Sequence, residues 1–330
     1  MKHRLRLAAA ALVVVGAAAG TLRERSGEPV RVVIPPGSTL SDVADSLSSR
    51  DVIGYPSLFE MYARALGAAR DLKAGTYDLE TGTSWRLALR SLTRGEVVTV
   101  PLTIPEGYRL KQMAVRIAGL TGEPEDRVLE LLETSAAAGE LPGPGLEGYL
   151  FPDTYRFARG VPVETVVDAM VERYRAVWTP RRRARLGDLG MTEREVVTLA
   201  SIVQAEARRV DEMPRISGVY HNRLDAGWLL QADPTVLYAL GGYRARLLFA
   251  AIDSVRGSPY NTYTQRGLPP GPIGSPGEQA IEAALFPEEH DYMYFVAWPD
   301  GSHVFTRSLA EHNAARVDAI RAREANSAGS

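Results

Sequence analysis

A short segment that occurs twice in the first third of the chain constrains the fold more than any other feature. The two copies, at residues 33–47 and 103–117, are VIPPGSTLSDVADSL and TIPEGYRLKQMAVRI, with the shared pattern I-P-x-G-x-x-L-x-x-[VM]-A-x-x-[LI]. In each copy a short β-type run precedes a Pro/Gly turn, and apolar residues then recur at helical spacing. Two copies are too few for a solenoid. The sequence therefore predicts two related small α/β units, each with a strand, a turn and a helix.

The residues after each copy complete these units. In the first unit, residues 72–80 (LKAGTYDLE) predict a strand, and a helix is expected from Ser84 to about Thr93. The second unit continues through a helix near 124–138 and a Gly/Pro-rich loop. We assign residues 26–97 to the first unit and residues 98–160 to the second.

Helix signals dominate the rest of the chain. Apolar spacing predicts a helix from Val163 to about Trp178, with Pro180 as its stop. Thr192 and Glu195 form a T-x-x-E capping box, which predicts the start of the next helix. Residues 292–306 alternate around an Asp-Gly turn and predict a β-hairpin. Further helices are expected after Pro214, from residue 308 to about 325 before a polar tail at 326–330, and at Asp233-Pro234 and Ser275-Pro276, each interpreted as a cap followed by the first helical residue.

The N-terminus predicts export across the inner membrane. MKHRLR is basic, and the sixteen residues from Leu7 to Leu22 are uncharged and mostly apolar. This length lies between a signal-peptide core and a full membrane span. A buried N-terminal helix is the alternative, but the charges flank the apolar run instead of patterning it. We expect residues 1–25 to be a signal-anchor segment, with everything after Arg23 outside the cytoplasm.

Composition excludes several classes of function. The formal net charge is −2, so bulk electrostatics do not indicate nucleic-acid binding. The chain has no cysteine, which removes thiol nucleophiles, disulfides and cysteine zinc sites. Its five histidines have no metal-binding spacing, and Ser201 does not lie in a G-x-S-x-G elbow. We expect no metal and no cofactor.

One carboxylate interrupts an apolar helical stripe. Val196, Leu199, Val203 and Glu206 follow one another at steps of three, four and three residues. A carboxyl held against apolar neighbours loses solvation of its charged form, so its pKa rises and it can act as a proton donor near neutral pH. The alternative is a helix that reaches the surface at its end, where Arg208 and Arg209 would pair with the acid.

Two loops carry residues suited to sugar binding. Residues 258–277 combine tyrosines, Asn261 and threonines with five prolines, and residues 229–238 bring polar groups to a helix start. Aromatic rings with polar tips suit sugars, which stack on rings and need several hydrogen bonds. A loop kept rigid for stability is the alternative, with Asp233 as a simple N-cap. The candidate binding residues are Gln231, Asp233, Thr235, Tyr260, Asn261, Thr262 and Tyr263.

These motifs, in this order, resemble the endolytic murein transglycosylase family, also called YceG-like. The matching stretches are EGYLFPDTYRF, LASIVQAEA, VYHNRL, LLQADPTVLYAL, YNTYTQRGLPPGPIGSPG and YFVAWPDGSHVFTRSLAEHN. The first unit also resembles the LysM glycan-binding module, through its strand–helix–helix–strand order. The resemblance implies an α+β fold: a membrane anchor, a LysM-like domain, and a mixed helical catalytic domain over residues 98–325 that carries the hairpin.

The resemblance also implies a reaction. It places the catalytic acid at Glu206 and the second glutamate of many relatives at Gln204, which lies off the apolar stripe. The implied activity cleaves nascent peptidoglycan strands at the inner membrane, leaves 1,6-anhydro ends, and involves the cell-wall synthesis machinery. A muramidase-type hydrolase, with Asp233 or Asp153 as second carboxylate, is one alternative. A non-catalytic glycan-binding scaffold is the other.

Overall fold

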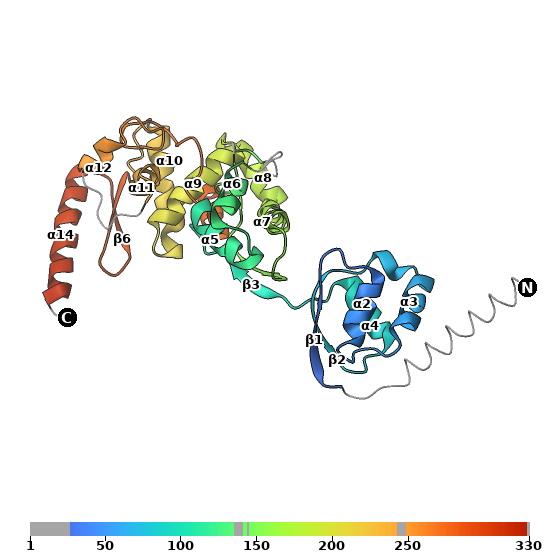
Figure 1. The fold of residues 1–330 in the computed structure, drawn as a ribbon. Coiled ribbons are helices and arrows are strands. Elements are labelled where there is room, and N and C mark those ends of the chain that lie inside the picture. Colours follow the sequence, from blue (N-terminus) through green and yellow to red (C-terminus); the bar gives the residue numbers. More distant parts are fainter. Residues whose placement is uncertain (1–26, 135–140, 144, 243–248, 329–330) are drawn as a thin grey trace, which may run out of the picture. The chain divides into compact units, whose positions relative to one another are not determined.

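The chain folds into two compact units of mixed helix and strand. The computed structural model describes residues 27–134, 141–143, 145–242 and 249–328 (Figure 1). From here on, the first unit means the described residues up to Pro101 together with Arg156–Val161. The second unit means the described residues of Leu102–Tyr155 and those from Pro162 onward, and it includes the second repeat copy. Helices combined with two-stranded sheets make this an α+β fold, as predicted. The expected anchor at residues 1–25 lies outside the described residues, and no helix within them is both long and apolar enough to cross a membrane.

The first unit has the predicted order of strand, two helices and strand. Strands β1 (Pro29–Ile34) and β2 (Gly75–Glu80) pair antiparallel, with Ile34 opposite Gly75. Thr39 caps the first helix through a capping box with Asp42. The helices, including a final one that Ser84 caps as predicted, are α2 (Leu40–Ser48), α3 (Pro56–Ala65), the short 3-10 helix η1 (Ala68–Arg70) and α4 (Trp85–Arg94).

The second copy of the repeat opens the second unit with the same local structure. Strand β3 (Val100–Thr103) leads through a Pro/Gly turn into helix α5 (Leu110–Thr121). Gly107 in that turn has φ +75, and Gly37 in the first copy has φ +79. Because this left-handed backbone favours glycine, the two turns explain the shared P-x-G of the sequence. The predicted relation between the two copies is confirmed at this level.

The remainder of the second unit is mostly helical. Strand β4 (Thr154–Phe157) pairs with β3, and the predicted hairpin is confirmed as β5 (Tyr294–Ala297) and β6 (His303–Thr306), with Val296 opposite Val304. The helices are α6 (Glu125–Thr134), α7 (Val163–Val177), α8 (Pro180–Leu189), α9 (Glu193–Glu206), η3 (Val210–Glu212), α10 (Met213–Asp225), α11 (Asp233–Ala239), α12 (Phe249–Ser254), α13 (Glu278–Leu285) and α14 (Leu309–Ala328).

Helix α9 is the centre of the second unit. It starts at the predicted capping box, in which the Thr192 hydroxyl accepts from Glu195 N and the Glu195 carboxylate accepts from Thr192 N at 2.8 Å. From Val196 to Val203 its side chains are buried, and it packs against α8, α10, α11 and α13. A helix enclosed on this many sides is fixed in position, so the residue at its end is fixed as well.

Pro180 follows the end of α7 at Val177, as predicted, and it is also the first residue of α8, where a proline needs no backbone N–H partner. Two expectations about helix starts were wrong. Ser275-Pro276 does not open α13, which starts at Glu278 after Gly277. Asp233 is the first residue of α11 and Ala232 is the N-cap, so the Asp233 side chain does not cap the helix.

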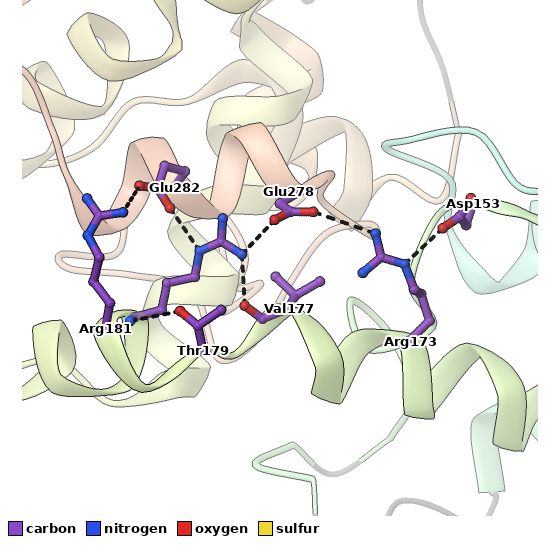
Figure 2. A network of polar contacts seen from close by, with 8 residues as sticks. Asp153, Arg173, Val177, Thr179, Arg181, Glu278 and Glu282 are labelled. Carbon is purple, nitrogen blue, oxygen red and sulfur yellow. Dashed lines mark hydrogen bonds and ion pairs between the residues drawn. The ribbon is translucent and has the colours of Figure 1, made fainter.

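An ion network joins the α7–α8 corner to α13. The Arg182 guanidinium donates to Glu278 at 2.9 Å, to Glu282 at 2.8 Å and to the carbonyl of Val177 at 2.8 Å. Figure 2 shows the two glutamates of α13 facing the arginines of the opposite helices, with Arg173 between Glu278 and Asp153. Because α13 also packs on α9, this network helps to hold α13 against the central helix.

Candidate active site

Glu206 is the last residue of α9 and continues its buried face. Val196, Leu199 and Val203, which precede it on the stripe, are 0% exposed, whereas Glu206 keeps part of its surface open. The carboxyl therefore lies at the boundary between the apolar core and the outside. Arg209 does not pair with it, since its guanidinium lies 3.3 Å from the carboxylate of Asp211.

The surroundings of Glu206 favour its protonated form. The pKa of Glu206 is raised to about 7, mainly by burial and in second place by the nearby Asp233 carboxylate. The Tyr220 hydroxyl, which donates to Glu206 Oε1 at 3.0 Å, and the charge of Arg223 act in the opposite direction. A carboxylic acid with a pKa near 7 holds its proton at neutral pH and still releases it readily.

Tyr220 and Arg223 belong to α10 and were not predicted as site residues. Tyr220 is 1% exposed, and its ring packs edge-on against Phe295 of the hairpin, with centroids 5.9 Å apart. Arg223 is also buried, and it donates to the carbonyls of Met293, at 2.8 Å, and of Leu230. The only sequence signal for them was the matched stretch VYHNRL, in which both residues lie one helical turn apart.

Asp233 faces the acid from the start of α11. Its carboxylate accepts a hydrogen bond of 2.5 Å from the Tyr263 hydroxyl, and the side chain is exposed. Gln231, also exposed, has a left-handed backbone with φ +50, and its N–H donates to the carbonyl of Thr262 at 3.1 Å. Asp233 and Tyr263 therefore lie close to Glu206, and the Gln231 backbone contact joins the segment before α11 to the loop that carries Tyr263.

Three other predicted residues are buried inside those loops. Thr262 Oγ1 accepts from the N–H of Ala232 at 3.0 Å and lies 2.8 Å from the hydroxyl of Thr235. Asn261 donates to the carbonyls of Ile252, at 2.9 Å, and Val255, at 3.2 Å. Because Thr235, Asn261 and Thr262 are at most 1% exposed, their hydrogen bonds hold the loops in shape.

Helix α9 also holds the loop that follows these residues. Ser201 Oγ accepts from the N–H of Ile273 at 3.0 Å, and Gln204 Oε1 accepts from the N–H of Gly277 at 3.0 Å. Ser201 and Gln204 lie one helical turn apart on a face adjacent to the apolar stripe. We call this pair of contacts the loop clasp. It assigns Gln204 a structural contact distinct from that of Glu206.

A second carboxyl with a raised pKa lies in the same unit. Glu147 precedes the buried segment Gly148–Phe151, and burial raises its pKa to about 7. It lines a cavity of about 860 Å³ together with Arg109, Tyr238 and Tyr260. Of the predicted site residues, Tyr260 lines this cavity, and Glu206 does not. In the sequence, EGYLFPDTYRF was used only as a matching stretch, and its first residue, Glu147, was not predicted as a site residue.

The arrangement around Glu206 combines three features of a proton-donating carboxyl. A buried helix presents Glu206 at its end, a tyrosine donates to the carboxyl, and a second carboxylate keeps its pKa high. Such an arrangement is suited to general acid–base chemistry.

Comparison with known proteins places the chain in a family. A model described as the YceG-like family matches residues 32–318. The endolytic murein transglycosylase of Bacillus subtilis is 33% identical over 305 residues, which cover 87% of this chain and 84% of that protein. The protein of the same name from Streptococcus pneumoniae D39 is 30% identical, with 86% of this chain and 58% of that protein covered.

A solved structure has the same fold. The crystal structure of a putative YceG-like protein from Listeria monocytogenes matches with a TM-score of 0.60 and 34% identity, covering 87% of this chain and 99% of that one. The chain belongs to the YceG-like family, which confirms the resemblance drawn from its motifs. It is thereby an enzyme of the lytic transglycosylase class.

Proposed function

We propose that the protein is an endolytic peptidoglycan lytic transglycosylase with Glu206 as its acid and base. The observation that carries this proposal is the position of Glu206, which is partly open at the end of a buried helix with its pKa raised to about 7. The family relatives named endolytic murein transglycosylase support the substrate. The bond cleaved would be the one between N-acetylmuramic acid and the following N-acetylglucosamine.

One carboxyl is sufficient for this reaction. Protonated Glu206 donates its proton to the glycosidic oxygen as the bond from that oxygen to C1 of the muramyl sugar breaks. The resulting carboxylate then takes the proton of the 6-hydroxyl of that sugar, whose oxygen bonds to C1. The products are a 1,6-anhydro end and a free hydroxyl, and Glu206 is protonated again. General acid–base catalysis of this kind supplies about 10² to 10⁴ in rate.

The neighbours of Glu206 have distinct proposed roles. Asp233, held by Tyr263, keeps the pKa of Glu206 high and lies where positive charge develops on the sugar. Gln231 and Tyr263 offer polar groups toward the substrate, and Tyr260 offers a ring. Thr235, Asn261 and Thr262 support these contacts from inside the loops.

A hydrolase is the second candidate, and it needs a second carboxylate near the acid. Asp233 has such a position, because its charge acts on Glu206. Asp153 is less suited, since its carboxylate pairs with the Arg173 guanidinium at 2.9 Å. A glycan-binding scaffold without activity is the third candidate, and nothing in it would require a proton donor with a pKa near 7.

Product masses distinguish these candidates. We expect the full chain in detergent to release, from uncrosslinked glycan strands, fragments with ends lighter by one water, and mass spectrometry would detect them. Reducing ends of full hydrated mass would instead identify a hydrolase. Strands left intact but co-sedimenting with the folded protein would identify a scaffold.

The rate should fall as pH rises through about 7. Above its pKa Glu206 loses the proton that it must donate, so the active fraction falls about tenfold for each further pH unit. Asp233→Asn removes a charge that raises this pKa, and we expect the alkaline limb of kcat/KM to move to lower pH. Asp211→Asn is the matched control, because Asp211 pairs with Arg209 and should leave the limb in place. A limb that does not move in Asp233→Asn would contradict the role of Asp233.

We further propose the location and partners of the enzyme. The basic and apolar start of the sequence supports a single pass through the inner membrane, with the catalytic unit outside the cytoplasm. The first unit has the strand–helix–helix–strand order of a LysM-like domain and would bind glycan strands. Cell-wall synthesis enzymes at the membrane would be the protein partners.

A further inference from the structure

The cavity beside Glu147 is a second feature of the catalytic unit that needs a ligand to explain it. Its volume of about 860 Å³ lies within the range of small-molecule sites. The side chains that the argument uses come from four separate parts of the chain: Arg109, Glu147 with Tyr149, Tyr238 and Tyr260.

The Glu147 carboxylate has unused hydrogen-bonding capacity. Its contacts are long: Leu110 N donates at 3.3 and 3.4 Å, and the Tyr238 hydroxyl donates at 3.5 Å. A carboxylate has about four acceptor positions, so several remain for a ligand N–H or O–H. Arg109, whose charge acts on Glu147, is held over the Tyr238 ring at 5.0 Å.

Tyr149 also lines this cavity, and its hydroxyl is buried. The side chain is 1% exposed, and its Oη has no hydrogen-bond partner among the described residues. A buried hydroxyl without a partner costs about 1–3 kcal/mol. Gly148, with φ +84, turns the chain so that Glu147 and Tyr149 both line the cavity, and its Cα packs against Pro272.

Two tyrosine rings form an aromatic wall. The centroids of the Tyr238 and Tyr260 rings lie 4.8 Å apart, and the ring planes form an angle of 43°. Aromatic rings, a carboxylate acceptor and a hydroxyl among the lining residues of one cavity suit a sugar that carries an amide. The amide N–H needs an acceptor such as Glu147, its carbonyl needs a donor such as Tyr149, and the sugar ring packs against an aromatic face.

We propose that this cavity binds an N-acetylated amino sugar of the glycan strand at a position other than the bond that Glu206 cleaves. Helix α11 links the two places: Asp233 at its start faces Glu206, and Tyr238, five residues later, lines the cavity. Five helical residues span about 7.5 Å, so units of one strand can reach both. The assignment rests on the proposed function for the identity of the strand.

Calorimetric titration with an oligomer of four β-1,4-linked N-acetylglucosamine units tests this assignment. The full chain carrying Glu206→Gln is the background, so that no turnover interferes. Added Glu147→Gln should weaken binding about threefold to tenfold, because the ligand N–H then donates to a neutral amide oxygen instead of a carboxylate. Added Tyr149→Phe should weaken it about threefold to tenfold and leave the melting temperature unchanged or higher, because only an unpartnered hydroxyl is removed.

Tyr292→Phe is the matched control, since Tyr292 packs on the hairpin residue Phe305 and does not line the cavity. Equal affinities in Tyr149→Phe, Glu147→Gln and the control would overturn the assignment, and any binding would then belong to another surface such as the first unit. Equal binding of cellotetraose, which lacks acetamido groups, would also overturn it. These outcomes are independent of the Glu206 proposal, which is tested separately by the masses of the cleavage products and by the cleavage rate of Glu206→Gln.

Discussion

Glu206→Gln should reduce strand cleavage by at least about 100-fold and up to about 10⁴-fold, with little change in strand binding. The amide keeps the size of the side chain and can still accept the hydrogen bond from Tyr220, but it carries no proton to donate. The loss should therefore appear in kcat. Initial rates of release of anhydro ends, measured by mass spectrometry, would give its size.

Glu172→Gln is the control for this prediction. Glu172 is an exposed residue of α7, so the same chemical change should leave the rate unaltered. A thermal melt of both variants would establish that they are folded. Cleavage by Glu206→Gln at more than a tenth of the normal rate would rule Glu206 out as the acid, and Glu147 would be the next residue to substitute.

Gly148→Ala should lower the free energy of unfolding of the second unit by about 3 kcal/mol. The backbone at Gly148 has φ +84, which costs an alanine about 1–2 kcal/mol. A Cβ there would also overlap the Pro272 ring and lie 3.3 Å from Val197 of α9. Scanning calorimetry would follow the unfolding of the second unit.

Gly122→Ala separates the two causes. Gly122 ends α5 with φ +83, nearly the same backbone, but nothing lies within 4 Å of its Cβ position. Gly122→Ala should therefore lower the free energy of unfolding only by the cost of backbone strain, about 1–2 kcal/mol. The remaining difference between the two variants, about 1–2 kcal/mol, would measure the overlap of the Cβ with Pro272 and Val197. Equal losses in the two variants would show that Gly148 is not needed for close packing.

Local signals in the sequence predicted much of the fold. The repeat predicted both strand–turn–helix units, Thr192 and Glu195 predicted the start of α9, and the Asp-Gly turn predicted the hairpin. These features depend on residues a few positions apart, so their causes are visible in the sequence. Pro180 shows the limit of such signals, because a proline suits the first turn of a helix as well as the residue after one.

The candidate site was predictable only in part. Glu206 could be found because a single helical stripe shows that its position borders the core. Tyr220 and Arg223 could not be found, since α10 has its own pattern and nothing in that pattern says which face meets Glu206. Glu147 was also missed, because no pattern near it in the sequence indicates that it is buried. Its burial depends on Tyr238, which lies 91 residues further along the chain.

The loop clasp has a consequence for the transfer of parts between relatives. Ser201 and Gln204 bind the N–H groups of Ile273 and Gly277, and Glu206 lies two residues beyond Gln204 on the same helix. The positions of Glu206 and of the loop segment 273–277 are therefore fixed by the same helix, although more than sixty residues of sequence separate them. A chimera that takes the loop from a relative but keeps this α9 would lose the matched contacts of Ser201 and Gln204 with the loop. Helix α9 and the loop should therefore be exchanged together in engineered chimeras.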